Sequence, residues 1–387
     1  DGMHTVIRDI AEDRYTEKEI AAFLVAASQN LTINEVQSLT RARAEFAHRF
    51  DWGQDLVVDK HSMGGIPGSR ITMIVIPIVA AHGLLIPKTS SRAITSAAGT
   101  ADAMETVARV ELTPDEVQQT VRESNGCIAW NRRLNHSSID DVMNSITRPL
   151  GIDSTKWAVA SILSKKLAAG ATHTIIDIPV GPYAKVQQGR EGRELSRLFE
   201  EVGAGIGMTV IARVTDGSRP IGRGIGPALE VRDVYKVLEN APDAPEDLRE
   251  KALGFAASIL EWDPEVSRGR GRDLAAKILQ TGQALKSLES IIDAQGRKGD
   301  PDRPGDLVHE VTASRSGTIS KIDSYRISGI ARRAGAPMDK SAGVDLAIRL
   351  GEEVKAGDTL YFIHANVESD FRIAGDAAEN ESGIEID

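Results

Sequence analysis

The chain has 387 residues, of which 41% are hydrophobic and only 4% aromatic, and its formal net charge is −10. This length can bury the cores of two or three packed units. The negative charge argues against a general nucleic-acid or membrane-surface binder, because both need a positive field. Cys127 is the single cysteine, which excludes a disulfide framework and a multi-cysteine zinc site and fits a reducing, cytoplasmic location.

The N-terminal segment is predicted to be helical. Thr16 and Glu19, and likewise Thr32 and Glu35, have the spacing of a capping box, and apolar residues follow the first box at helical intervals. The second of these helices is expected to run to about Phe50. The chain begins with Asp1 rather than methionine, so we expect a trimmed form of something longer.

From Leu56 the sequence changes to short apolar strands, glycine turns and amphipathic segments, which indicates an α/β layer. The segment "VVDKHSMGGIPGSRITMIVIP" (57–77) predicts a strand, a glycine-rich turn and a helix, which would gather backbone N–H groups around an anion. Lys60 would add a positive charge, and Ser62 and Thr72 would add hydroxyl donors. The spacing matches neither a P-loop nor a dinucleotide fingerprint. An ordinary turn with a surface lysine is the alternative, and this segment alone does not separate the two.

Two further segments carry polar groups suited to phosphate or sugar. In "PKTSSRAITSAAGTAD" (87–102), hydroxyls surround Arg92; the alternative is a helix start rich in Ser and Thr caps. In the predicted helix "STKWAVASILSKKLAAG" (154–170), Ser161 and Lys165 share one face. There the alternative is a basic last turn, which the helix dipole favours.

Weaker signals come from a histidine and from a second glycine-rich turn. His61 is a candidate catalytic group, although a lone histidine beside a turn is more often a structural hydrogen-bonder. No further histidine stands at metal-ligand spacing, so no metal is predicted. Gly222, Gly224 and Gly226 precede a predicted helix without an acidic residue at the ribose-reading distance, so a second nucleotide site there is a weak prediction.

The remaining elements follow from periodicity. Residues 172–181 and 207–217 are predicted to be buried strands, and residues 271–296 a long amphipathic helical region. Residues 296–306 have the composition of a linker, and alternating apolar and polar residues after it predict a small β-rich module.

Five segments in order resemble one family: "DKHSMGGIPG", "KTSSRAITSAAGTAD", "RPLGID", "ASILSKKLAAG" and "SAGVDLAIRLGEEVKAGDTL". The chain is similar, over nearly its whole length, to the thymidine phosphorylase and AMP phosphorylase family of pentosyltransferases. Its "GGIPG" and "KTSSRAITSAAGTAD" segments are closer to the AMP branch, which usually carries a further N-terminal domain that is not present here. Thr95 and Ser96 stand where thymidine enzymes tend to have glycine and histidine, which puts a strict thymidine preference in doubt.

The resemblance implies an α/β fold in which a small all-α domain faces a larger α/β domain across a cleft, with a C-terminal β-rich α+β module. The implied boundaries are 1–50 plus 139–170 for the helical domain, 51–138 plus 171–298 for the α/β domain, and 305–387 for the module. A homodimer or higher homo-oligomer is also implied.

The resemblance further assigns roles to residues at matching positions. Phosphate ligands would be Lys60, Ser62, Thr72, Ser90 and Thr100. The nucleotide or its base would be bound by Gly65, Ser91, Arg92, Ala93, Ile94, Thr95, Ser96, Arg148, Ser161, Lys165 and Lys185. Asp153 matches the proton donor of the AMP branch.

The implied activity is phosphorolysis of the N-glycosidic bond of a nucleoside or nucleoside 5′-monophosphate. Inorganic phosphate would be the co-substrate, with no metal or organic cofactor. The AMP-like loop favours the nucleotide, and thymidine or uridine is the alternative substrate. A non-catalytic relative with an anthranilate phosphoribosyltransferase-like fold is the alternative from another class, against which Lys60, Ser62, Arg148 and Lys165 argue. No nucleic acid or membrane partner is expected.

Overall fold

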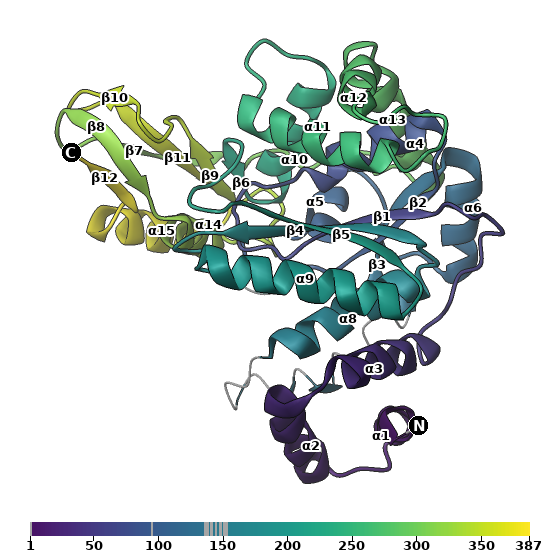
Figure 1. Ribbon diagram of the computed structural model, residues 1–387. Coiled ribbons are helices and arrows are strands. Elements are labelled where there is room, and N and C mark those ends of the chain that lie inside the picture. Colours follow the sequence, from purple (N-terminus) through teal and green to yellow (C-terminus); the bar gives the residue numbers. More distant parts are fainter. Residues whose placement is uncertain are drawn as a thin grey trace.

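The computed structural model describes residues 2–93, 96–134, 139, 142–143, 145–146, 149 and 154–387. A parallel sheet lies between helical layers, the N-terminal helices pack on one side, and a small α+β module stands at one end (Figure 1). The predicted α/β class with a β-rich C-terminal module is confirmed. Among the described residues, no helix is both long and apolar enough to span a membrane.

The N-terminal helices are α1 (Gly2–Ala11), α2 (Glu17–Asn30) and α3 (Ile33–Glu45). Both predicted capping boxes are present at the starts of α2 and α3. Helix α3 ends at Glu45, short of the expected Phe50. The chain leaves the helix there, and the Phe50 N–H donates to the Ala168 carbonyl, 2.9 Å away, at the end of α8 (Thr155–Ala168). This contact ties the N-terminal helices to α8.

The central sheet is parallel throughout, as two hydrogen-bonded groups. One has the order β1 (Val58–Ser62), β4 (His173–Val180), β5 (Thr209–Asp216), and the other pairs β2 (Ile86–Ser90) with β3 (Gly126–Trp130). A parallel bridge between Val57 and Leu85 joins the groups. Helices α8 and α9 (Gly189–Gly205) lie on one side of the sheet (Figure 1). Strand β4 is buried, as the sequence predicted, because both faces of the sheet are covered there. The prediction that 207–217 is also a buried strand is wrong in part: β5 forms, but at the edge of the sheet, with Arg213 and Val214 exposed.

The other face is covered by α4 (Thr72–His82) and by α10 to α13, namely Pro227–Leu238, Glu246–Leu260, Gly271–Gln280 and Gln283–Gln295. Helix α6 (Pro114–Ser124) and a 3-10 turn (Asn131–Leu134) pack in a separate cluster with β3, and the short α5 (Thr100–Met104) precedes α6. The predicted helical region over 271–296 is confirmed and consists of two helices, because Gly282 adopts φ +75 and separates α12 from α13. A left-handed residue cannot continue an α-helix. Residues 72–80 of α4 are all buried, so this helix forms the centre of the core.

The turn at Gly222, Gly224 and Gly226 is a packing feature. A Cβ on Gly224 would lie 2.4 Å from the Leu229 backbone, and one on Gly226 would lie 2.3 Å from the Ala342 carbonyl oxygen. These glycines therefore let the α10 segment approach the C-terminal module closely.

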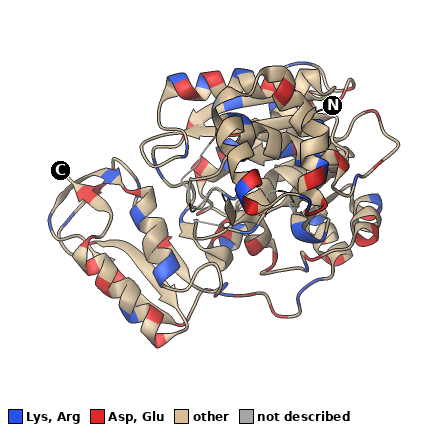
Figure 2. Ribbon diagram, turned by 90° about the horizontal axis from the view of Figure 1, so that it is seen from below, with Lys and Arg blue, Asp and Glu red and all other residues tan. Residues whose placement is uncertain are grey.

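The C-terminal module contains α14 (Ser324–Arg333), α15 (Glu368–Asn380) and the strands β7 to β12, which are Leu307–Thr312, Gly317–Ile322, Gly343–Leu346, Glu353–Val354, Thr359–Ala365 and Ile384–Ile386. Strand β6 (Gly224–Ile225) of the α/β part pairs with β9. Through this pairing the sheet of the module is continuous with the α/β part. In Figure 2 the module forms a lobe of its own, with acidic and basic residues interspersed on its helices.

Candidate active site

The site lies at the carboxyl ends of β1 and β2, where open α/β sheets bind ligands. A cavity of about 430 Å³ opens there, between the end of the sheet, α8 and α14. The structure brings most of the predicted site residues to its wall, which includes Lys60, His61, Ser62, Gly65, Thr72, Ser90, Ser91, Arg92, Ala93, Ser96, Thr100, Lys165 and Lys185.

Ser161 does not line the cavity but accepts a hydrogen bond from the Lys165 ammonium at 3.3 Å. Ile94, Thr95, Arg148 and Asp153 lie outside the described residues. Their assignments remain predictions from the resemblance.

Lys60 forms the floor of the cavity. Its side chain is buried, 1% exposed, and its ammonium donates to the Thr72 hydroxyl at 3.1 Å. Burial lowers the pKa of Lys60 to about 7, and the nearby Asp177 carboxylate opposes this effect. A bound anion would favour the protonated ammonium in the same way that a carboxylate does.

Two further buried lysines, which the sequence analysis did not single out, meet beside Lys60. Lys166 lies 2.7 Å and Lys88 lies 3.8 Å from the buried carboxylate of Asp59. Burial lowers the pKa of Lys88 well below its usual value, and neighbouring Lys166 adds to the effect. Their positions in the sequence could have indicated burial. Lys88 directly follows an apolar run, and Lys166 follows Lys165 on a half-buried helix.

His61 adjoins this cluster. Burial lowers the pKa of His61 well below its usual value, and the positive charges of Lys166, Lys88, Lys165 and Lys60 lower it further. The imidazole is therefore neutral near pH 7 and can donate or accept one hydrogen bond at each nitrogen, according to its tautomer. It is not a source of formal positive charge.

Asp177, within β4 and opposite Ser62 in the strand register, orients the hydroxyl of Ser62. The Ser62 hydroxyl donates to Asp177 at 3.1 Å, and the same carboxylate lies 3.0 Å from the Lys251 ammonium. Asp177 is fully buried. Sequence reasoning missed it, because a lone acidic residue in an apolar strand gives no indication of its partner.

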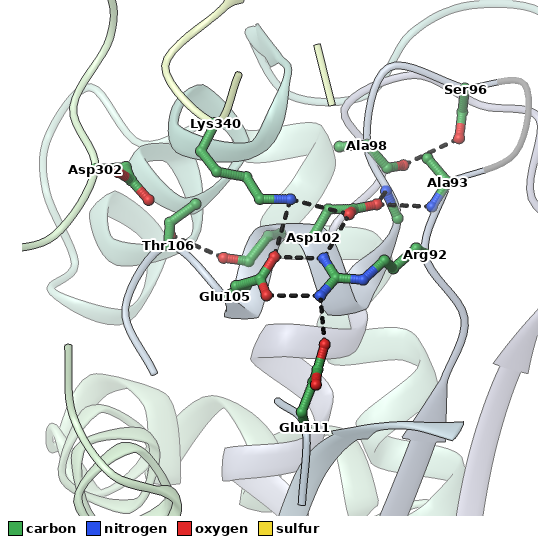
Figure 3. Close-up of polar contacts among 12 residues, drawn as sticks. Arg92, Ala93, Ser96, Ala98, Asp102, Glu105, Thr106, Glu111, Asp302 and Lys340 are labelled. Atoms are coloured by element: carbon green, nitrogen blue, oxygen red, sulfur yellow. Dashed lines mark hydrogen bonds and ion pairs between the residues drawn. The ribbon is translucent and has the colours of Figure 1, made fainter. Parts of the chain in front are cut away.

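Arg70 holds the opposite wall. Its guanidinium lies 2.6 Å from the buried Glu230 carboxylate and donates to the Thr100 hydroxyl at 3.1 Å and to the Ala98 carbonyl at 3.2 Å. Arg92, predicted to bind nucleotide, directs its guanidinium to Glu105 and over the Trp130 ring at 4.5 Å (Figure 3). Arg92 thus lines the cavity while its charge is held by an acidic group.

The C-terminal module also reaches the cavity, which the sequence analysis did not foresee. Ser324, Tyr325 and Ser328 of α14 line it. The Ser324 hydroxyl is buried and has no hydrogen-bond partner among the described residues. A buried hydroxyl without a partner, on a residue that lines a cavity, is suited to binding a polar ligand group.

Charge decides what the cavity can hold. Within a chain of net charge −10, five basic side chains line this one cavity: Lys60, Arg70, Lys88, Lys165 and Lys166. Among the described residues, no group of His, Cys, Asp or Glu is placed to hold a metal ion. The arrangement suits an oxyanion bound by ammonium groups and hydroxyls.

Comparison with known proteins agrees with this geometry. Residues 54–285 match the glycosyl transferase family, a/b domain, and residues 318–385 match the pyrimidine nucleoside phosphorylase C-terminal domain. A bifunctional ribose 1,5-bisphosphokinase-thymidine phosphorylase of Azorhizobium caulinodans is 61% identical over 96% of this chain and 54% of its own length. A putative thymidine phosphorylase of Methylococcus capsulatus is 53% identical, over 98% of this chain and 74% of its own.

The chain spans only about half to two thirds of the length of several bifunctional relatives. Among solved structures, anthranilate phosphoribosyltransferase of Thermus thermophilus matches with a TM-score of 0.63 and 17% identity, over 76% of this chain and 94% of its own. That likeness concerns the fold. The two family matches and the high identity to full-length relatives show that the chain belongs to the thymidine phosphorylase family of glycosyl transferases.

Proposed function

We propose that the protein catalyses phosphorolysis of the N-glycosidic bond of a nucleoside or nucleoside 5′-monophosphate. A phosphate oxygen bonds to C1′ of the sugar, the C1′–N bond breaks, and the base leaves with the bonding electrons and takes up a proton. The products are free base and a sugar 1-phosphate, or ribose 1,5-bisphosphate when the substrate is a ribonucleoside monophosphate. Phosphate is the co-substrate and no metal or organic cofactor takes part.

The observation that carries this proposal is the buried ammonium of Lys60, beside Thr72 and amid other cations. The glycosidic carbon becomes oxocarbenium-like in the transition state. A phosphate bound by Lys60, Ser62 and Thr100 is held for attack, which removes the entropy cost of bringing two reactants together. Lys88 and Lys166 are paired with Asp59. They would therefore act on this phosphate through longer-range electrostatic attraction and not through a direct hydrogen bond.

The leaving base requires stabilisation at the other end of the cavity. Lys165, positioned by Ser161, supplies a positive charge there. Arg148, which the family resemblance assigns to the base, would add a second positive charge. For a purine, Asp153 would donate a proton, which requires its pKa to be raised by burial or by a neighbouring carboxylate.

The nucleoside monophosphate is the substrate that we favour. Its phosphorolysis gives ribose 1,5-bisphosphate, and the Azorhizobium relative is named for a ribose 1,5-bisphosphokinase joined to a thymidine phosphorylase. The names of the relatives equally support thymidine as the second candidate. We also propose that the protein is a homodimer or higher homo-oligomer.

A panel of nucleosides and their 5′-monophosphates, with and without phosphate, tests the proposal by release of free base. Phosphate-dependent release supports phosphorolysis, and the best substrate identifies the base and the 5′ group. Release of free base at the same rate with and without phosphate would indicate a hydrolase. Absence of release from every member of the panel would overturn the proposal.

A further inference from the structure

Residues 91–93 and 96–99, the described part of the segment between β2 and α5, line the cavity. A single carboxylate binds the backbone at Ala93 and at Gly99. Asp102 Oδ2 accepts from the Ala93 N–H at 2.7 Å and from the Gly99 N–H at 3.0 Å. A Cβ on Gly99 would lie 2.6 Å from the Ala93 nitrogen, so the two ends touch. Asp102 therefore holds the backbone of Ala93 next to that of Gly99.

The Asp102 carboxylate is buried, 2% exposed, so its charge needs partners. Its second oxygen, Oδ1, accepts from Lys340 Nζ at 3.1 Å and from Arg92 at 3.3 Å (Figure 3). Lys340 Nζ also lies 3.0 Å from Glu105. Two cations thus meet two carboxylates in one network.

The two cations are not equivalent. Arg92 approaches Glu105 through two nitrogens, with Nη2–Oε1 at 2.6 Å, and lies 3.7 Å from Glu111, so its charge is shared among three acids. Lys340 lies at nearly equal distances from Asp102 and Glu105 and is only 17% exposed. Without Lys340, the buried Asp102 would keep a single cation that is bound more closely by Glu105.

Lys340 belongs to the C-terminal module, 238 residues from Asp102 in sequence. A second contact joins the same two parts, because Ala97 of the segment is buried in the module's apolar core with Ile225, Ile330 and Val344. The Ala228 N–H also donates to the Lys340 carbonyl at 3.0 Å, which fixes the backbone beside α10. The module therefore contacts this part of the cavity wall through the apolar packing of Ala97 and through the ion pairs of Lys340.

We propose that Lys340 is a positioning residue through which the C-terminal module holds Ala93 and Gly99 in place at the cavity wall and hence sets binding of the nucleoside part of the substrate. The inference rests on the proposed function, in which this segment contacts the substrate. Lys340 acts through Asp102 and does not touch the reacting atoms.

The test compares Lys340→Met with Lys340→Arg, and with Lys355→Met as an exposed control in the same module. Amide hydrogen exchange reports the segment directly. In Lys340→Met the Ala93 and Gly99 amides should exchange at least about tenfold faster, while peptides from β4 stay protected. The KM for the nucleoside substrate should rise about tenfold with a smaller change in kcat, and Lys340→Arg should restore most of both.

The exchange measurement separates this inference from the proposed function, since it needs no turnover. Unchanged exchange at Ala93 and Gly99 in Lys340→Met would overturn the inference, whatever the activity. Faster exchange with an unchanged KM would also overturn it, because the segment would then not govern substrate binding. Equal effects in Lys355→Met would show that the module is generally destabilised and would count against Lys340.

Discussion

The ammonium of Lys60 on β1 donates to the hydroxyl of Thr72 on α4 across 3.1 Å. The bond joins the end of a buried strand to the start of a buried helix at the floor of the cavity. Both groups can also reach a ligand, since both line the cavity. The contact therefore holds a charge ready for an anion before the anion arrives, which is how preorganised electrostatic sites work.

Replacement of Lys60 by methionine should abolish phosphorolysis and leave the fold intact. Methionine keeps the volume but removes the charge that faces the attacking phosphate, and the loss of one preorganised donor costs about 100-fold or more in kcat. Base release at saturating phosphate measures the effect, and circular dichroism checks the fold. Lys355→Met is the matched exposed control. Undiminished turnover by a folded Lys60→Met would remove Lys60 from the mechanism.

Phosphate binding should weaken as the pH rises through about 7, the value to which burial lowers the Lys60 pKa. Below that pH the ammonium is protonated and attracts phosphate; above it the neutral amine does not. The KM for phosphate should therefore increase from about pH 6 to about pH 9. Lys60→Arg is the comparison, because a guanidinium stays charged throughout this range. An identical pH profile in that variant would show that another group titrates.

Substitution of Asp59 by asparagine should destabilise the protein. Asp59 is fully buried, and its carboxylate faces the ammoniums of Lys166 and Lys88. Removing the charge leaves buried cations unpaired, which costs about 3–5 kcal/mol in free energy of unfolding. Urea denaturation measures the loss. Asp376→Asn, an exposed change on α15, should stay within about 0.5 kcal/mol; a similar stability for both variants would contradict the pairing.

Ser324→Ala should separate binding from stability. The Ser324 hydroxyl has no partner among the described residues, so its loss breaks no hydrogen bond in the free protein and should not lower stability. If the hydroxyl binds substrate, the KM for the nucleoside or nucleotide rises about threefold to tenfold. Ser314→Ala, an exposed site between β7 and β8, should change neither quantity. A drop in stability with an unchanged KM would make Ser324 a purely structural group.

The sequence carried much of the fold because the relevant signals are local. Hydrogen bonds of the two capping boxes join residues three apart, and the apolar run from His173 to Val180 can only be a buried strand in this setting. The strand, turn and helix around Lys60 were also readable. Periodicity also predicted the helical region over 271–296, but it did not reveal the break at Gly282, where the backbone turns.

The site was only partly readable, since the resemblance supplied positions but not contacts. Most residues predicted to bind phosphate or nucleotide do line one cavity, but Lys88, Lys166 and Asp177 were missed. The roles of Arg148 and Asp153 remain predictions. A buried charge looks the same in sequence whether it has a partner or not.

By itself, the sequence determined the helices, most of the strands and the glycine-rich turn after Val58, because capping, alternation and glycine spacing act over a few residues. Only the tertiary structure decided which charges meet. Lys340 and Asp102 are 238 residues apart and touch because β6 and β9 bring the module against the α/β part. Which buried charges pair depends on which distant segments pack together in the fold, and no local sequence pattern contains that information.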